Sequence, residues 1–180
     1  MLNLREHRAL LTTVGALLVA STGSGIAWSE PGGHREPADQ LLDAVEHSES
    51  TMRDYIDEVS ERFDQIESAS DAGRQEELAT ALMADVPGLA RDARSGVRSA
   101  RAEVTAVDLP DGGRLDHARD AYVAHMDAWL AEYDDAMAAP AGVVEIEPAV
   151  NRTFDEAVAA FERTGLQGAQ EDRMEELLAD

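Results

Sequence analysis

The chain has 180 residues, and its 37 acidic residues against 15 basic ones give a formal net charge of −22. A charge of this size rules out nonspecific binding to nucleic acids or to anionic membranes as a main activity. The absence of cysteine excludes disulfides, zinc–thiolate sites, covalently attached haem and thiol catalysis, so we expect packing alone to stabilise the fold.

The N-terminal segment has the layout of an export signal. Arg5 and Arg8 precede the apolar run Ala9–Ala20, and no charge follows until Glu30. A basic start followed by an apolar stretch and small residues is typical of a secretory signal peptide. We therefore expect residues 1–27 to direct the chain out of the cytoplasm.

The alternative to a cleaved signal is a membrane anchor. Residues 9–29 form an uncharged stretch that is nominally long enough to cross a bilayer as a helix. Residues 21–25 (Ser-Thr-Gly-Ser-Gly) are small and polar, however, and they continue a membrane helix poorly. We favour cleavage after Ala27 and keep an uncleaved anchor as the alternative.

The expected organisation is a signal peptide or anchor (1–27), a flexible linker (28–36) and one helical domain (37–180). The positive-inside rule places the domain outside the cytoplasm, so we predict an extracellular, periplasmic or cell-envelope protein. Membrane contact is expected only through an uncleaved N-terminal segment. Loss of residues 1–27 leaves 13 basic and 36 acidic residues, a net charge of −23.

The first predicted helix runs from Pro37 to Ser68, and Pro37 suits its first turn. Apolar residues recur there at alternating spacings of three and four, which is the heptad pattern of packed helices. The members of this seam are Leu42, Val45, Met52, Ile56, Val59, Phe63 and Ile66.

The second predicted helix begins near Asp71, which is a suitable N-cap residue. Its apolar side carries Leu78, Leu82, Val86, Leu89, Ala93, Gly96, Ala100 and Val104. Pro87-Gly88 interrupts the pattern, so we expect a kink, or a restart with Asp85 as the new cap.

Two further helices follow the turn at residues 109–113 (Leu-Pro-Asp-Gly-Gly). The third is predicted from about Arg114 to Ala138, with one stripe formed by Leu115, Ala118, Tyr122, Met126, Trp129, Tyr133 and Met137. The fourth begins near Pro148. Gly165 and Gly168 weaken it, so the last stretch is expected to form a separate short helix.

The fold class that these patterns predict is all-α. No segment alternates with a period of two, and four amphipathic stripes of similar length close economically around one core in an antiparallel bundle. Aromatic residues make up only 4% of the chain. We therefore expect a thin core and closely spaced helices.

Four arginines form the sharpest local anomaly in an acidic chain: Arg91, Arg94, Arg98 and Arg101. Their helical spacing places them on a ridge beside the apolar stripe. One hypothesis is a binding site for an anionic partner, because guanidinium groups suit phosphate and carboxylate. The favoured alternative is that they neutralise acidic flanks of neighbouring helices.

Glu49 occupies the one position of the first seam where an apolar residue is missing. It is a candidate interior carboxylate, although such a residue more often sets helix register or reaches solvent. The acidic first helix is interpreted as a solvated face, with weak cation binding as the alternative.

The histidines are not expected to form a site. His125 is placed beside the apolar stripe and would need a shift of its ring to reach the core, and His47 is placed opposite the seam. No glutamate precedes a histidine of the domain by three residues, as a di-iron bundle requires. We predict no metal and no cofactor.

Catalytic motifs are also missing: there is no Gly-x-Ser-x-Gly turn, no phosphate-binding glycine loop and no His-Glu-x-x-His helix. We therefore expect a nonenzymatic interaction or structural protein of the cell envelope, with a protein partner or self-association. The alternative is an extracytoplasmic module that binds a ligand or a metal.

Overall fold

A computed structural model describes residues 36–139 and 148–178, and these residues are helical with no strand. The helices are α2 (Pro37–Ser68), α3 (Ala72–Ala106), α4 (Arg114–Ala138), α5 (Pro148–Glu162) and α6 (Ala169–Leu177). The all-helical prediction is therefore confirmed. The expected leader (1–27) and nearly all of the expected linker lie outside the described residues.

Local signals set the ends of these helices. Pro37 lies in the first turn of α2, where the missing N–H removes no hydrogen bond. The Asp71 carboxylate accepts a hydrogen bond of 2.8 Å from the Gly73 N–H and caps α3. Gly165 and Gly168 adopt φ angles of 76° and 58°, which side-chain-bearing residues disfavour, and they separate α5 from α6.

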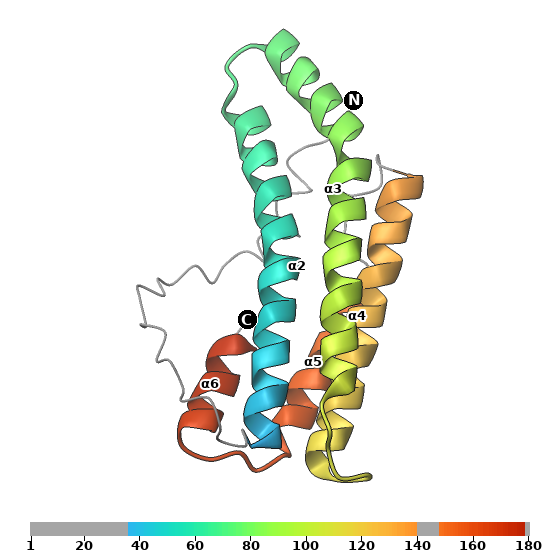
Figure 1. The fold of residues 1–180 in the computed structure, drawn as a ribbon. Helices are drawn as coiled ribbons and strands as arrows, with labels where there is room; N and C mark the ends of the chain where they lie inside the picture. The colour runs from blue at the N-terminus through green and yellow to red at the C-terminus, as the bar shows by residue number, and fades with distance from the viewer. Residues whose placement is uncertain (1–35, 140–147, 179–180) are drawn as a thin grey trace, which may run out of the picture.

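Pro87 does not divide the second helix. α3 continues through it, so the predicted restart with Asp85 as a cap is wrong. The Asp85 carboxylate instead accepts a hydrogen bond of 2.6 Å from Arg62 on α2. A proline costs one helical hydrogen bond and bends the axis, and the buried neighbours Val86 and Ala90 keep packing on either side. The axis of α3 changes direction in this region (Figure 1).

The helices pack mainly against their neighbours along the chain: α2 against α3, α3 against α4, and α4 against α5 (Figure 1). α6 returns to the start of α2, where Arg173 forms an ion pair of 2.7 Å with Asp43. These contacts are consistent with a helical bundle. The expectation of four stripes of similar length is wrong, because α5 has 15 residues while α2, α3 and α4 have 32, 35 and 25.

The core contains most of the predicted stripe residues, including Met52, Val86 and Tyr122. It also contains Ala90 and Val97 of α3, both fully buried and both outside the predicted stripe. α3 lies between α2 and α4, so two of its sides are covered.

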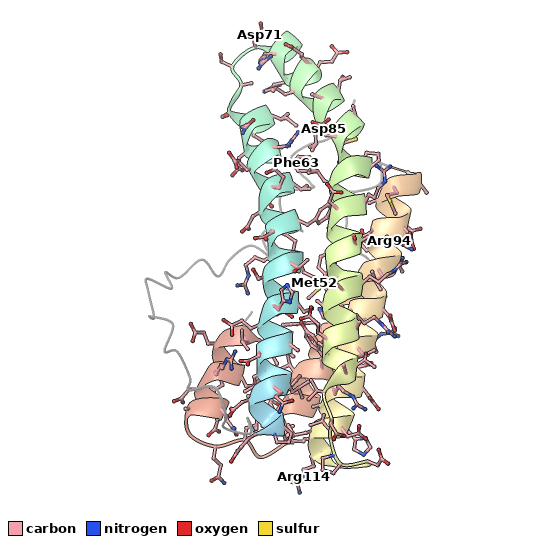
Figure 2. The ribbon with its side chains drawn as sticks, viewed as in Figure 1. Met52, Phe63, Asp71, Asp85, Arg94 and Arg114 are labelled. Atoms are coloured by element: carbon pink, nitrogen blue, oxygen red, sulfur yellow. The ribbon has the colours of Figure 1, made fainter. Side chains whose placement is uncertain are left out.

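The α2–α3 hairpin projects beyond the end of α4 (Figure 1). Arg94 of α3 pairs with Asp134 of α4, and α4 ends four residues later, at Ala138. Because the two helices are antiparallel, the part of α3 before about residue 89 has no α4 residue beside it. We call residues 58–88 the arm. Asp71 marks its tip, at the opposite end of the molecule from Arg114 (Figure 2).

Candidate functional site

The predicted arginine ridge is divided between two roles. Arg94 forms an ion pair of 2.7 Å with Asp134, and Arg101 contacts both carboxylate oxygens of Asp127 at 2.6 and 3.0 Å. Both aspartates belong to α4, so these two arginines bridge adjacent helices. This is the arrangement that the favoured alternative for the ridge requires.

Arg91 and Arg98 occupy the other side of the ridge. Both are exposed, and neither forms an ion pair with another described residue. They lie seven residues apart, about two helical turns. The hypothesis of anion binding on the ridge therefore rests on these two side chains.

Glu49 belongs to α2 and faces α4. The Tyr122 hydroxyl, from fully buried Tyr122, donates a hydrogen bond of 2.7 Å to Glu49 Oε1. Burial raises the pKa of Glu49 from 4.5 to about 7, although the Tyr122 bond and the Arg53 charge act in the opposite direction. Burial of the Tyr122 hydroxyl, together with the negative charge of Glu49, raises the pKa of Tyr122. The carboxyl group is thus a partly buried link between two helices.

His125 is buried, with 3% of its surface exposed, so its expected position beside the core is wrong. α5 covers that side of α4: His125 Nδ1 lies 3.3 Å from Thr153 Oγ1, and the His125 and Phe154 rings are 5.2 Å apart. Burial lowers the pKa of His125 from 6.5 to about 4, so the imidazole is neutral at physiological pH. His47 also has a partner, Glu103 of α3, at 2.9 Å.

These interior polar groups bind one another across helices. Periodicity identified Glu49 as unusual but gave no sign of Tyr122 as its partner, because the pair joins residues 73 positions apart. Glu49 and His125 both form hydrogen bonds between helices. Such bonds specify helix register when the buried polar groups have partners.

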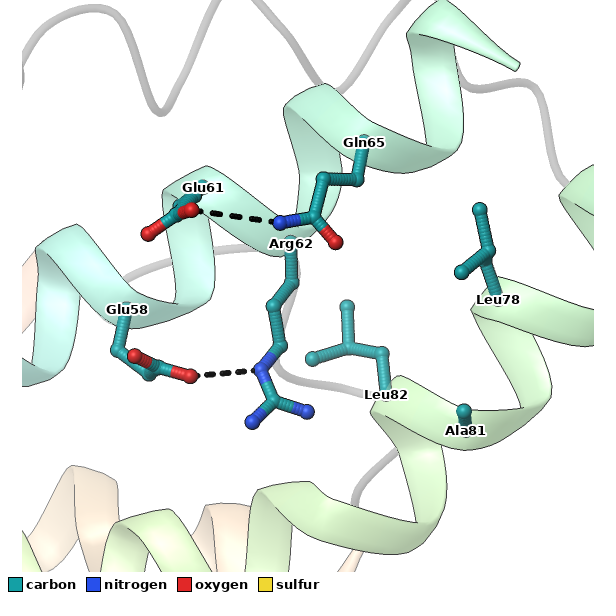
Figure 3. Close-up of a pocket in the computed structure, with 7 residues that line it drawn as sticks. All are labelled: Glu58, Glu61, Arg62, Gln65, Leu78, Ala81 and Leu82. Carbon is teal, nitrogen blue, oxygen red and sulfur yellow. Dashed lines mark hydrogen bonds and ion pairs between the residues drawn. The ribbon is translucent and has the colours of Figure 1, made fainter.

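A groove between α2 and α3 lies on the arm. It has a volume of about 300 Å³, and it is lined by Glu58, Glu61, Arg62 and Gln65 of α2 and by Leu78, Ala81 and Leu82 of α3 (Figure 3). One wall is therefore charged and the other is aliphatic. Sequence reasoning missed this groove, because its two walls are formed only when the hairpin closes.

Arg62 crosses the groove from its charged wall. Its guanidinium group pairs with Glu58 at 2.8 Å and with Asp85 at 2.6 Å. Glu61 has no ion pair within the part of the chain that the structure describes, and its Oε1 accepts a weak hydrogen bond of 3.3 Å from the Gln65 amide. Glu61 is exposed and thus available to a cation from solution.

The arm as a whole is strongly acidic. Residues 58–88 contain eight aspartates and glutamates and two arginines. Both arginines already have carboxylate partners, because Arg74 pairs with Glu77 at 2.7 Å in addition to the pairs of Arg62. The surface of the arm therefore attracts cations.

No metal site is found in the described ranges: no group of three or more His, Asp or Glu side chains there is placed to hold an ion. None of the helices described is long and apolar enough to cross a membrane. Comparisons with protein-family models, curated proteins and solved structures found no match to this chain.

Proposed function

We propose that this protein is an exported, nonenzymatic interaction protein of the cell envelope that presents the surface of its helical hairpin to another protein. The observation that carries this proposal is the arm, a pair of helices that extends past α4 with an open groove between them. A helical pair kept clear of the bundle contributes less to a common core than one packed on all sides. Its projection is explained if it contacts a partner.

The composition of the arm supports the same reading. Ile66 and Leu82 are buried between its helices, whereas Phe63, Leu78 and Met83 pack against the core and remain half-buried. The part of these side chains that stays accessible offers apolar surface to a partner.

The alternative, a ligand- or metal-binding module, rests on Glu49, on the acidic first helix and on the methionines. The position of Glu49 favours a structural role for this residue, since its carboxylate accepts a hydrogen bond of 2.7 Å from Tyr122. A group already used to join two helices is less available to an exogenous ligand.

The size of the native particle tests the interaction role. The full chain, carrying a C-terminal epitope tag, is expressed in its source organism, and envelope extracts are cross-linked and separated by mass. A cross-linked species larger than the tagged monomer, whose untagged full chain is 19.4 kDa, supports the proposal. A strictly monomeric protein, with no cross-linked species, would refute it.

Export is tested separately by fractionation and N-terminal analysis of the tagged protein. We expect a mature chain that begins at Trp28, in the envelope or the medium. A chain that retains Met1 and is recovered with cytosolic markers would contradict export, whatever its oligomeric state. Retention of Met1 in the membrane fraction would instead indicate an anchor.

A further inference from the structure

We infer that the groove on the arm is a docking site for a cationic amphipathic helix of another protein, with an aliphatic side chain seated on Leu78 and Ala81 and a basic side chain paired with Glu61. This inference rests on the proposed interaction function and names its partner class. The groove is charged on its α2 wall and aliphatic on its α3 wall (Figure 3).

The size of the groove defines what enters it. A volume of about 300 Å³ accommodates individual side chains but not a whole helix. An approaching helix therefore lies along the exposed surface of the arm and inserts an anchor residue. Leu82 is 1% exposed and forms a rigid base, whereas Leu78 is half-buried and Ala81 is exposed. Amphipathic helices bind grooves in this way, through apolar anchors spaced along one face.

Charge selects the sign of the partner. The excess of acidic residues on the arm repels an acidic segment and attracts a basic one. Glu61 sits at the edge of the groove without an internal cation, so a partner arginine gains an ion pair there without displacing Arg62. Arg62 stays bound to Glu58 and Asp85 and holds the two helices together.

Charge also disfavours a second copy of this chain as the occupant of the groove. Each copy carries a formal charge of −22, and two acidic arms brought together repel one another. The four-arginine ridge is the main basic feature of the bundle, but Arg94 and Arg101 already bind α4, so a second copy would offer the arm only Arg91 and Arg98 from this ridge. A foreign basic helix fits the arm better.

The test measures binding of the full chain to a synthetic helix by fluorescence anisotropy at about 0.15 M salt, where long-range attraction is screened. The probe is a peptide of about 18 residues, because shorter helices are marginal in water. Leucines occupy one face and arginines the other. A scrambled peptide of identical composition, without an apolar face, controls for charge alone.

Two variants localise the binding site. Glu61→Arg reverses the charge at the rim, and Ala81→Trp fills the groove; both positions are exposed, so both variants should fold, as circular dichroism will check. Glu156→Arg on α5 is the matched control, because it is also exposed and makes the same change in net charge. We expect Glu61→Arg and Ala81→Trp to weaken binding by about tenfold or more and Glu156→Arg to change it by less than about twofold.

Several results would overturn the inference. They are equal binding of the scrambled peptide, equal weakening by Glu61→Arg and Glu156→Arg, or no binding of the helical peptide. Sedimentation showing that the protein alone forms a dimer, which Ala81→Trp disrupts, would assign the groove to a second copy. Cross-linking in the source organism distinguishes the two proposals. If the complex persists with Glu61→Arg and Ala81→Trp, docking at this groove is refuted but the interaction function is not. If the wild-type chain is monomeric, the interaction function itself is refuted.

Discussion

Gly96 offers a sharp test of how closely α2 and α3 pack. A Cβ atom added at Gly96 would lie 2.6 Å from Thr51 Cγ2, well inside the optimum of about 3.5–4.0 Å for two carbon atoms. Thr51 is β-branched and stiff at χ1, and its hydroxyl donates a hydrogen bond of 2.9 Å to the His47 carbonyl. The substitution Gly96→Ala must therefore separate the helices locally or rotate Thr51 away from this bond.

Two effects of opposite sign determine the result. Alanine in place of glycine in a helix gains about 1 kcal/mol, whereas overpacking costs about 1–3 kcal/mol. We expect Gly96→Ala to lower the free energy of unfolding by up to about 2 kcal/mol. The variant Thr51→Ser keeps the hydroxyl and removes Cγ2, so in that background Gly96→Ala should stabilise the protein by about 1 kcal/mol.

Urea unfolding followed by circular dichroism measures all four members of this cycle. A coupling free energy of about 1–3 kcal/mol is expected between the two positions. Gly88→Ala is the matched control, since no atom lies within 4 Å of its added Cβ and only the helix-propensity gain should remain. If Gly96→Ala changes stability by the same amount with threonine and with serine at position 51, the close approach of the two helices is refuted.

Three further predictions concern charged and titratable groups. Burial raises the pKa of Glu49 from 4.5 to about 7. The stability of the wild type should therefore fall relative to that of Glu49→Gln as the pH rises through this interval, by at most about 3 kcal/mol. A stability difference that stays constant from pH 4 to pH 8 would contradict this. The pKa of His125 is lowered from 6.5 to about 4, so the wild type should lose stability relative to His125→Phe as the pH falls from 6.5 to 4. Urea unfolding at each pH measures this difference. A wild type that gains stability relative to the variant on acidification would refute the buried neutral imidazole. The double variant Arg94→Gln with Arg101→Gln should remain helical, and its free energy of unfolding should fall by no more than about 2 kcal/mol, because partly exposed ion pairs contribute about 0–1 kcal/mol each. If circular dichroism shows that the variant is unfolded at room temperature, these pairs are essential to the fold.

Helix limits could be predicted because their signals are local. Pro37, the Asp71 cap and the glycines after α5 act within a few residues of the chain, and the structure places helix ends beside each of them. Pro87 misled the prediction because its effect depends on packing. A proline can end an isolated helix. When the turns on either side of it are held by buried contacts with an adjacent helix, the same proline bends the helix without ending it.

The candidate sites were less predictable, because each is formed by residues far apart in the chain. The spacing of the arginines placed them on one ridge, but the α4 aspartates that divide the ridge came from the antiparallel pairing of α3 and α4. The groove on the arm likewise forms only when α2 and α3 pack together, and it stays open because α4 ends before it reaches the arm.

The amino-acid sequence by itself determined that this chain is helical, where most helices begin and end, and which stripe of each helix is apolar. Tertiary structure decided how many sides of each helix are covered. Val97 and His125 are buried because α3 and α4 each lie between two neighbours, so each buries a second face that a single-stripe reading leaves out. Helical periodicity shows the direction of a side chain, whereas burial depends on what another helix places in that direction.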